Sequence, residues 1–63
     1  MSQNTEILKH LETGKGLTQL DALELFGCMR LAARIDTLRK RHDIMTHLVV
    51  KNGKAFAEYR MIL

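Results

Sequence analysis

The segment Leu17–Ile35, with the sequence LTQLDALELFGCMRLAARI, contains the signals for two short helices separated by a tight turn. Thr18 is predicted to cap the first helix, because Asp21 follows three residues later in a variant of the capping box. Gly27 is predicted to end that helix, because glycine adopts a left-handed conformation at little cost. The second helix is expected from Met29 to Arg41. Two helices joined in this way can present the second one to the major groove of DNA.

The second predicted helix has two distinct faces. Leu31, Ile35 and Leu38 recur at helical spacing and are expected to face the core. Another set of residues lies roughly 90° away from this stripe. It offers three guanidinium groups, a hydroxyl group and a methyl group, and it consists of Arg30, Ala33, Arg34, Thr37 and Arg41.

A further helix is predicted before this segment, from Thr5 to Thr13. Asn4 or Thr5 can cap its N-terminus, and Gly14 is expected to end it. Its apolar stripe is expected to consist of Ile7, Leu8 and Leu11. This helix is expected to support the two-helix segment in one shared core.

C-terminal to the helices, the hydrophobic pattern changes from a helical period to a period of two. Strands are therefore predicted over Ile44–Lys51 and from Lys54 to about Ile62. Asn52-Gly53 between them is the preferred pair for a type I′ turn, which fixes the register of the hairpin. In that register Lys51 lies opposite Lys54, and the two like charges repel each other unless an anion lies between them.

The two faces of the predicted hairpin differ in character. One face is expected to cover the helices, and it consists of Leu48, Val50, Ala55, Ala57 and Tyr59. Val49 and Phe56 share the opposite face and are expected to be partly exposed. Together with Leu20 and Leu23, they are the apolar residues that the pattern does not place in the core.

Sixty-three residues are enough for one small domain, and a single domain over residues 1–63 is expected. No apolar run approaches the ~18 residues of a membrane span, and the N-terminus lacks the basic and apolar regions of a signal peptide. The single cysteine, Cys28, excludes an intramolecular disulfide and fits a reducing compartment. We therefore expect a cytoplasmic protein without a membrane partner.

The net charge of +3 is distributed unevenly along the chain. Residues 1–29 carry two lysines against four carboxylates, a net charge of −2. Residues 30–63 carry eight lysines and arginines against three carboxylates, a net charge of +5. The basic half begins with the second helix of the opening segment. Such an asymmetry indicates a polyanionic partner, usually a nucleic acid or an anionic membrane surface.

The chain offers no pattern for catalysis or metal binding. Its three histidines and Cys28 are scattered, without the spacing of a zinc site. No serine-based or cysteine-based catalytic group can be assembled from them. We therefore expect no enzymatic activity, no metal, no cofactor and no small-molecule substrate.

Three helices followed by a hairpin is the element order of an α+β winged helix-turn-helix domain, in which the hairpin is called the wing. Four segments resemble the small winged helix-turn-helix proteins of bacteriophages and prophages: residues 17–27, 29–35, 38–41 and 56–60. The resemblance extends from about Ile7 to Tyr59 and implies a DNA-binding fold with a regulatory or accessory role. His42 departs from the pattern, because a glycine is more usual after the basic end of the helix. Another residue there can hold a strained backbone and change the entry angle of the wing.

The expected contacts follow from the chemistry of DNA. Arginine can bond guanine O6 and N7 in a bidentate manner, and a small apolar group can meet a thymine methyl. Arg30 and Arg34 are therefore expected to read base edges, and Ala33 to contact a thymine methyl. Thr37 is expected to reach a base or a phosphate. The remaining candidates are expected to contact backbone phosphates: Thr18 and Gln19 at a helix N-terminus, with Arg41, Lys51 and Lys54 elsewhere.

These observations predict sequence-specific binding to double-stranded DNA by a phage or prophage transcriptional regulator or accessory factor, in the cytoplasm of a bacterial host. The second helix of the segment is expected in the major groove and the wing on backbone phosphates. Two alternatives remain: a protein-interaction module on the same fold, such as a phage inhibitor of a host protein, or an excisionase-like factor that bends DNA. The sequence leaves open the target site, the direction of regulation, and whether the protein is a monomer or a homodimer.

Overall fold

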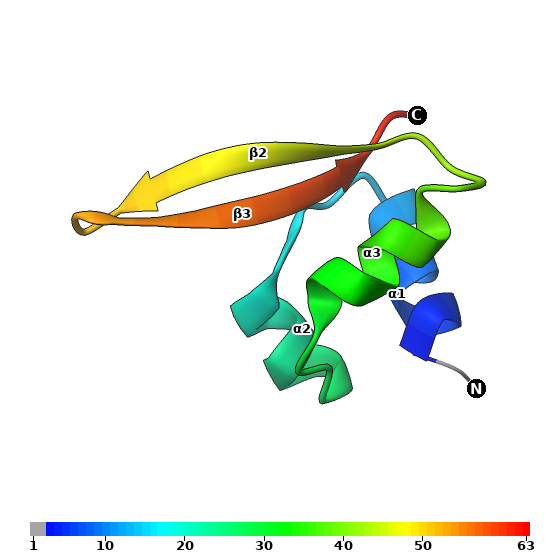
Figure 1. Cartoon of the computed structure of the whole chain (residues 1–63), viewed down its shortest axis with the longest axis horizontal. Coiled ribbons are helices and arrows are strands. Elements are labelled where there is room, and N and C mark those ends of the chain that lie inside the picture. Colours follow the sequence, from blue (N-terminus) through cyan, green and yellow to red (C-terminus); the bar gives the residue numbers. More distant parts are fainter. Residues whose placement is uncertain (1–2) are drawn as a thin grey trace.

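The computed structural model describes residues 3–63, which form three helices beneath an antiparallel sheet (Figure 1). The helices are α1 (Gln3–Glu12), α2 (Gln19–Phe26) and α3 (Leu31–Leu38). The strands are β1 (Leu17–Thr18), β2 (Ile44–Lys51) and β3 (Lys54–Met61), in the sheet order β1-β3-β2. Within the described residues, no helix has the length and apolar character needed to cross a bilayer. Met1 and Ser2, which begin the segment expected to lack signal-peptide features, lie outside the described residues.

The core lies between the three helices and the base of the hairpin. Its buried side chains come from every helix, from β1, from the turn after α2 and from the start of β2: Ile7, Leu11, Leu17, Ala22, Cys28, Leu31, Ile35, Leu38 and Ile44. The predicted core stripe of the third helix, Leu31, Ile35 and Leu38, is confirmed. Full burial of one large aliphatic side chain contributes about 1.5–3 kcal/mol, so this cluster is the main source of stabilisation.

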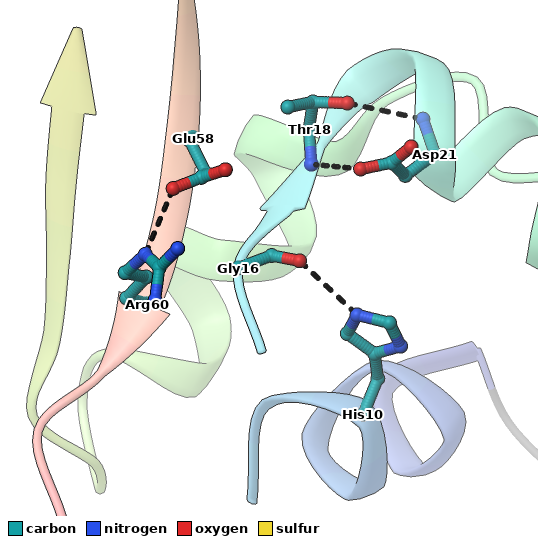
Figure 2. A network of polar contacts seen from close by, with 6 residues as sticks. All are labelled: His10, Gly16, Thr18, Asp21, Glu58 and Arg60. Carbon is teal, nitrogen blue, oxygen red and sulfur yellow. Dashed lines mark hydrogen bonds and ion pairs between the residues drawn. The ribbon is translucent and has the colours of Figure 1, made fainter. Parts of the chain in front are cut away.

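α2 begins and ends as its sequence predicts. The Thr18 hydroxyl accepts a hydrogen bond from the Asp21 N–H at 3.1 Å, and the Thr18 N–H donates to the Asp21 carboxylate at 3.3 Å (Figure 2). This reciprocal pair is the predicted capping box. Gly27 follows the helix with a φ of 64°, in the left-handed region, and its N–H donates back to the Leu23 carbonyl. The turn between the two central helices is therefore built by local signals.

α3 is shorter at both ends than the predicted range Met29–Arg41. Arg30 has a φ of −132° and a ψ of 67°, so it precedes the helix instead of lying in its first turn. After Leu38 the chain tightens, because the Arg41 N–H donates to the Leu38 carbonyl, three residues back, at 3.1 Å. Arg30 and Arg41 therefore flank the helix instead of lying within it.

Two further details correct the sequence prediction. α1 begins at Gln3, so Asn4 and Thr5 lie within its first turn and do not precede it as caps. The expected strain at His42 is absent, because Asn52 is the one non-glycine residue with a positive φ within residues 3–63. The chain therefore enters the wing without a left-handed residue at position 42.

The hairpin forms in the predicted register. Lys51 lies opposite Lys54, and the pairing continues without a bulge to Ile44 opposite Met61. The φ angles of Asn52-Gly53 are 53° and 76°, as a type I′ turn requires. A two-residue turn thus sets the alignment of both eight-residue strands.

The prediction for the helix-covering face of the hairpin is wrong in its outer half. Leu48 and Val50 are 74% and 68% exposed, and Ala55 is exposed as well. The hairpin extends past the helices (Figure 1), and where its outer half borders α2 it does so with the opposite face, through Val49 and Phe56. On the face that carries Leu48 and Val50, only the base of the hairpin reaches the core, through Ile44, Tyr59 and Met61. The expectation that Val49 and Phe56 are partly exposed is confirmed.

β1 holds the start of α2 against β3. Because β1 has only two residues, the hydrophobic pattern of the sequence could not predict this contact. Thr18 pairs with Glu58 across these strands. Gly16 permits the close approach, because a Cβ there would lie 2.5 Å from Glu58 Cδ. The Gly16 carbonyl also lies 3.1 Å from His10 Nε2, which ties α1 to the same strand (Figure 2). The N-terminal helix, β1 and β3 are therefore joined around residue 16.

Candidate nucleic-acid interface

Gln19 organises the turn between α2 and α3. Its Nε2 donates to the Cys28 carbonyl at 2.7 Å, and its Oε1 accepts from the Leu31 N–H at 2.8 Å. Arg30, at the N-cap position of α3, makes no side-chain capping bond, so Gln19 supplies the missing cap from α2. The sequence prediction gave Gln19 a phosphate contact and missed this role, because residues 19 and 31 come together only in the folded chain. Gln19 therefore fixes the position of α3 relative to α2.

Replacing Gln19 with methionine is expected to lower the stability of the protein by about 1–2 kcal/mol, as the loss of a helix cap does. Methionine keeps the length of the side chain but can neither donate to Cys28 nor accept from Leu31. Thermal unfolding measures the effect, with Leu20→Met as the matched control because Leu20 is 64% exposed on the same helix. An unchanged Tm for Gln19→Met would show that these bonds do not hold the turn.

The exposed surface of α3 carries the central members of the predicted site. Ala33, Arg34 and Thr37 are all exposed, while Arg30 and Arg41 lie just before and just after the helix. Within residues 3–63, the only ion pair joins Arg60 to Glu58, at 2.8 Å (Figure 2). The guanidinium of Arg34 is therefore not paired with Asp36 or with any other carboxylate of the described chain, and it remains available to an outside anion or base.

The two ends of α3 lie in different surroundings. Thr37, near its C-terminus, donates from Oγ1 to the Ala33 carbonyl at 3.3 Å, which leaves the hydroxyl oxygen free to accept. Thr37 and Arg41 border one shallow hollow of the surface together with Leu8 and His42. At the other end, Arg30 adjoins the helix start that Gln19 caps.

A groove between the N-terminus of α2 and the wing brings four predicted site residues together. Thr18 and Gln19 border it on the helix side, and Lys51 and Lys54 border it on the wing side. Apolar side chains also line it, namely Leu20, Val49 and Phe56. Two carboxylates border it as well, Asp21, which accepts from the Thr18 N–H, and Glu58, which pairs with Arg60. The two lysines lie directly opposite each other across the hairpin, and neither forms an ion pair within the described residues. The predicted phosphate contacts of α2 and of the wing are thus neighbours in the fold, although 33 positions separate Thr18 from Lys51.

Arg39 is a second residue whose role the sequence did not reveal. It follows α3, and its Nε donates to the Ile44 carbonyl at 3.1 Å while its Nη2 donates to Thr46 Oγ1 at 2.8 Å. These bonds connect the end of α3 to the first residues of β2. Arg39 therefore helps to set the angle between α3 and the wing, in addition to contributing positive charge.

The comparisons with known proteins agree with this architecture. A family model described as a winged helix-turn-helix domain matches residues 2–61, which is nearly the whole chain. Comparison with curated proteins and with solved structures gave no significant match. The helices α2 and α3 around Gly27 and the β2–β3 wing are the parts that this family description names. The chain therefore belongs to the winged helix-turn-helix domain family, and its fold is a DNA-binding fold.

Proposed function

We propose that this protein binds double-stranded DNA in a sequence-specific manner, with α3 in the major groove and the wing on backbone phosphates. The observation that carries the proposal is the exposed surface of α3, where Arg34 has no carboxylate partner within residues 3–63. An arginine free of internal partners can bond both guanine O6 and N7. The resemblance to phage and prophage proteins supports a role as a transcriptional regulator or accessory factor.

The N-terminal part of α3 is the best placed to read bases, because recognition helices present this end to the groove. Arg30 and Arg34 supply guanidinium groups there, and the methyl group of Ala33 lies on the exposed surface beside them. Thr37 and Arg41 follow toward the other end of the helix and are suited to the phosphates that flank the groove. In this arrangement the first half of α3 determines which DNA sequence is preferred. Thr37 and Arg41 add affinity that does not depend on the sequence.

The wing is suited to phosphates and not to bases. Lys51 and Lys54 face each other across the hairpin, so their like charges destabilise the wing in the absence of an anion. A backbone phosphate between or beside them removes that repulsion. Thr18 and Gln19 border the same groove at the N-terminus of α2, where the helix dipole also favours a negative charge, beside the Asp21 carboxylate that already accepts from the Thr18 N–H.

Binding of the purified protein to genomic fragments over a salt series tests the proposal. We expect log K to fall linearly with log salt, and some fragments to bind far more tightly than others. Selection from a random DNA pool would then give the preferred site. No measurable binding at low salt would refute DNA binding, and equal binding to all fragments would refute sequence specificity.

Replacing Lys51 or Lys54 with alanine is expected to weaken binding to all sequences by a similar factor. Each substitution should also reduce the slope of log K against log salt by about 1, because one fewer phosphate is neutralised. Lys9→Ala is the matched control, since Lys9 is an exposed lysine on α1, outside the groove. A change in sequence preference upon Lys51→Ala would show that the wing reads bases.

One observation favours a second candidate, a protein-interaction module on the same fold. Leu20 and Leu23 on α2 are 64% and 47% exposed, which leaves apolar surface beside the groove. A pull-down from host lysate after nuclease treatment distinguishes the two functions, because a protein partner is retained when DNA is removed. If DNA binding is found, fragment-mobility phasing shows whether the protein bends its site as an excisionase-like factor does.

A further inference from the structure

β2 is an edge strand with free main-chain groups. Among residues 3–63, the sheet order β1-β3-β2 leaves its outer side without a neighbouring strand. In a two-residue hairpin the residues that flank the turn exchange both main-chain hydrogen bonds, so odd-numbered residues of β2 bond to β3. The bond from the Ile62 N–H to the Asp43 carbonyl, at 2.9 Å, follows the same alternation. The N–H and C=O groups of Thr46, Leu48 and Val50 therefore point away from the sheet.

Charged side chains protect this edge only at its two ends. At the base, Arg39 donates to the Ile44 carbonyl and to Thr46 Oγ1. At the tip, Lys51 carries a positive charge. Between them Leu48 and Val50 are the most exposed large apolar side chains of the hairpin, and the segment contains no lysine, proline or bulge of the kind that normally prevents edge pairing.

We propose that a second copy of this chain pairs with β2, antiparallel, about a twofold axis at Val49. In this register Leu48 of each copy lies opposite Val50 of the other, so the free main-chain groups bond and the two exposed apolar side chains pack together. Registers closer to the base would displace or crowd Arg39 at Ile44 and Thr46. Registers closer to the tip would bring the two Lys51 charges together or pair Leu48 with the turn. The register centred on Val49 therefore avoids both Arg39 at the base of β2 and the charge of Lys51 at its tip.

The proposed pairing places the two helical bodies on the same side of one continuous six-stranded sheet. A twofold axis between antiparallel strands is perpendicular to the sheet, so the faces that carry the helices point in the same direction. Ile44 lies five residues from Val49, or about 17 Å at 3.4 Å per residue, which separates the two hairpin bases by about 34 Å. Half-sites one DNA turn apart are separated by about 34–36 Å. This last step rests on the proposed function, whereas the pairing itself does not.

Only residues 47–51 of each copy make the contact, so the interface is smaller than the roughly 1,200 Å² of stable specific complexes. We therefore expect a weak dimer whose population rises with concentration. Sedimentation equilibrium over a concentration series should show the wild-type mass approaching that of a dimer, and Leu48→Lys should remain monomeric at every concentration. Leu25→Lys is the matched control, because Leu25 is 59% exposed on α2, away from β2. This variant should dimerise as the wild type does. A wild type that is monomeric throughout, or a dimer that survives Leu48→Lys, would overturn the proposal.

Disulfide crosslinking of single-cysteine variants tests the register, and the wild-type protein gives the background rate. Val49 of one copy should lie about 4.5 Å, Cα to Cα, from Val49 of the other, within the range of a disulfide. Val49→Cys should therefore crosslink under mild oxidation faster than His47→Cys or Leu48→Cys. The native thiol of Cys28 is buried and should give no crosslink. Faster crosslinking at position 47 or 48 would overturn the register.

Both measurements use the protein without DNA, so the two proposals can fail separately. A dimer that binds no DNA would refute the proposed function alone. A protein that binds DNA but is monomeric at all concentrations would refute the β2 pairing alone. If both hold, the selected DNA should contain two half-sites about 10 base pairs apart.

Discussion

Replacing Arg34 with alanine is expected to reduce the affinity for the preferred DNA site roughly tenfold to hundredfold, while binding to unrelated sequences falls much less. The reason is that a bidentate contact to guanine contributes about 1–3 kcal/mol of discrimination, whereas loss of a phosphate contact affects every sequence alike. Competition binding with specific and random DNA measures both quantities. Stability should be unchanged, because the Arg34 side chain is exposed and forms no ion pair within residues 3–63.

Arg34→Lys is the control that separates base reading from charge. Lysine keeps the positive charge but not the planar, bidentate donor group of arginine. We expect Arg34→Lys to retain non-specific affinity and salt dependence and to lose most of the discrimination. If Arg34→Lys discriminates as the wild type does, Arg34 acts through its charge alone, and base reading must be assigned elsewhere on α3.

Replacing Ile35 with alanine is expected to destabilise the protein by about 2–5 kcal/mol, as large-to-small substitutions in cores do. Ile35 is fully buried on the face of α3 opposite to solvent. A chain of 63 residues has a total stability of roughly 3–9 kcal/mol, so this loss is a large share of it. We expect Ile35→Ala to be largely unfolded near 37 °C and to bind DNA only when cooled.

Thermal and urea unfolding measure this effect, with two controls of graded size. Ile35→Val removes a single methylene and should cost about 0.5–1.5 kcal/mol. Leu25→Ala removes an apolar side chain that is 59% exposed and should change stability much less than Ile35→Ala. Similar effects of Ile35→Ala and Leu25→Ala on stability would contradict the packing of α3 against the core.

The elements with strong local signals could be predicted from the sequence. The capping box of Thr18 and Asp21, the helix end at Gly27 and the register set by Asn52-Gly53 each depend on residues within a few positions of one another. The core stripe of α3 follows from helical periodicity in the same way. These signals were sufficient for the order of helices and wing.

The remaining features depend on contacts between distant residues. Gln19 caps α3 from twelve positions away, and Arg39 reaches across to Thr46 on the wing. The exposure of Leu48 and Val50 depends on how far the hairpin extends past the helices, which an alternating pattern cannot indicate. Periodicity identifies an apolar face, but it does not tell whether another element covers that face.

The residues of the candidate site likewise divide into those that local sequence signals predict and those whose neighbours appear only in the fold. Arg34 and Thr37 were placed on the exposed surface of α3 by the helical period alone. The neighbourhood of Thr18 with Lys51 and Lys54 appears only in the fold, because it requires β1 to hold α2 beside the wing. The side chain of Gln19 is engaged with the turn, so its predicted phosphate contact stays a prediction that binding measurements must test.

The pairing of β1 with β3 also affects the order in which the parts of the chain fold. Leu17 joins Tyr59, and Met61 packs on the core, so part of the surroundings of the first third of the chain comes from the last strand. Contacts between residues so far apart in sequence form late and slowly compared with local ones. Because every fully buried core residue lies between Ile7 and Ile44, we expect the helices to pack first and the pairing of β1 with β3 to complete the fold.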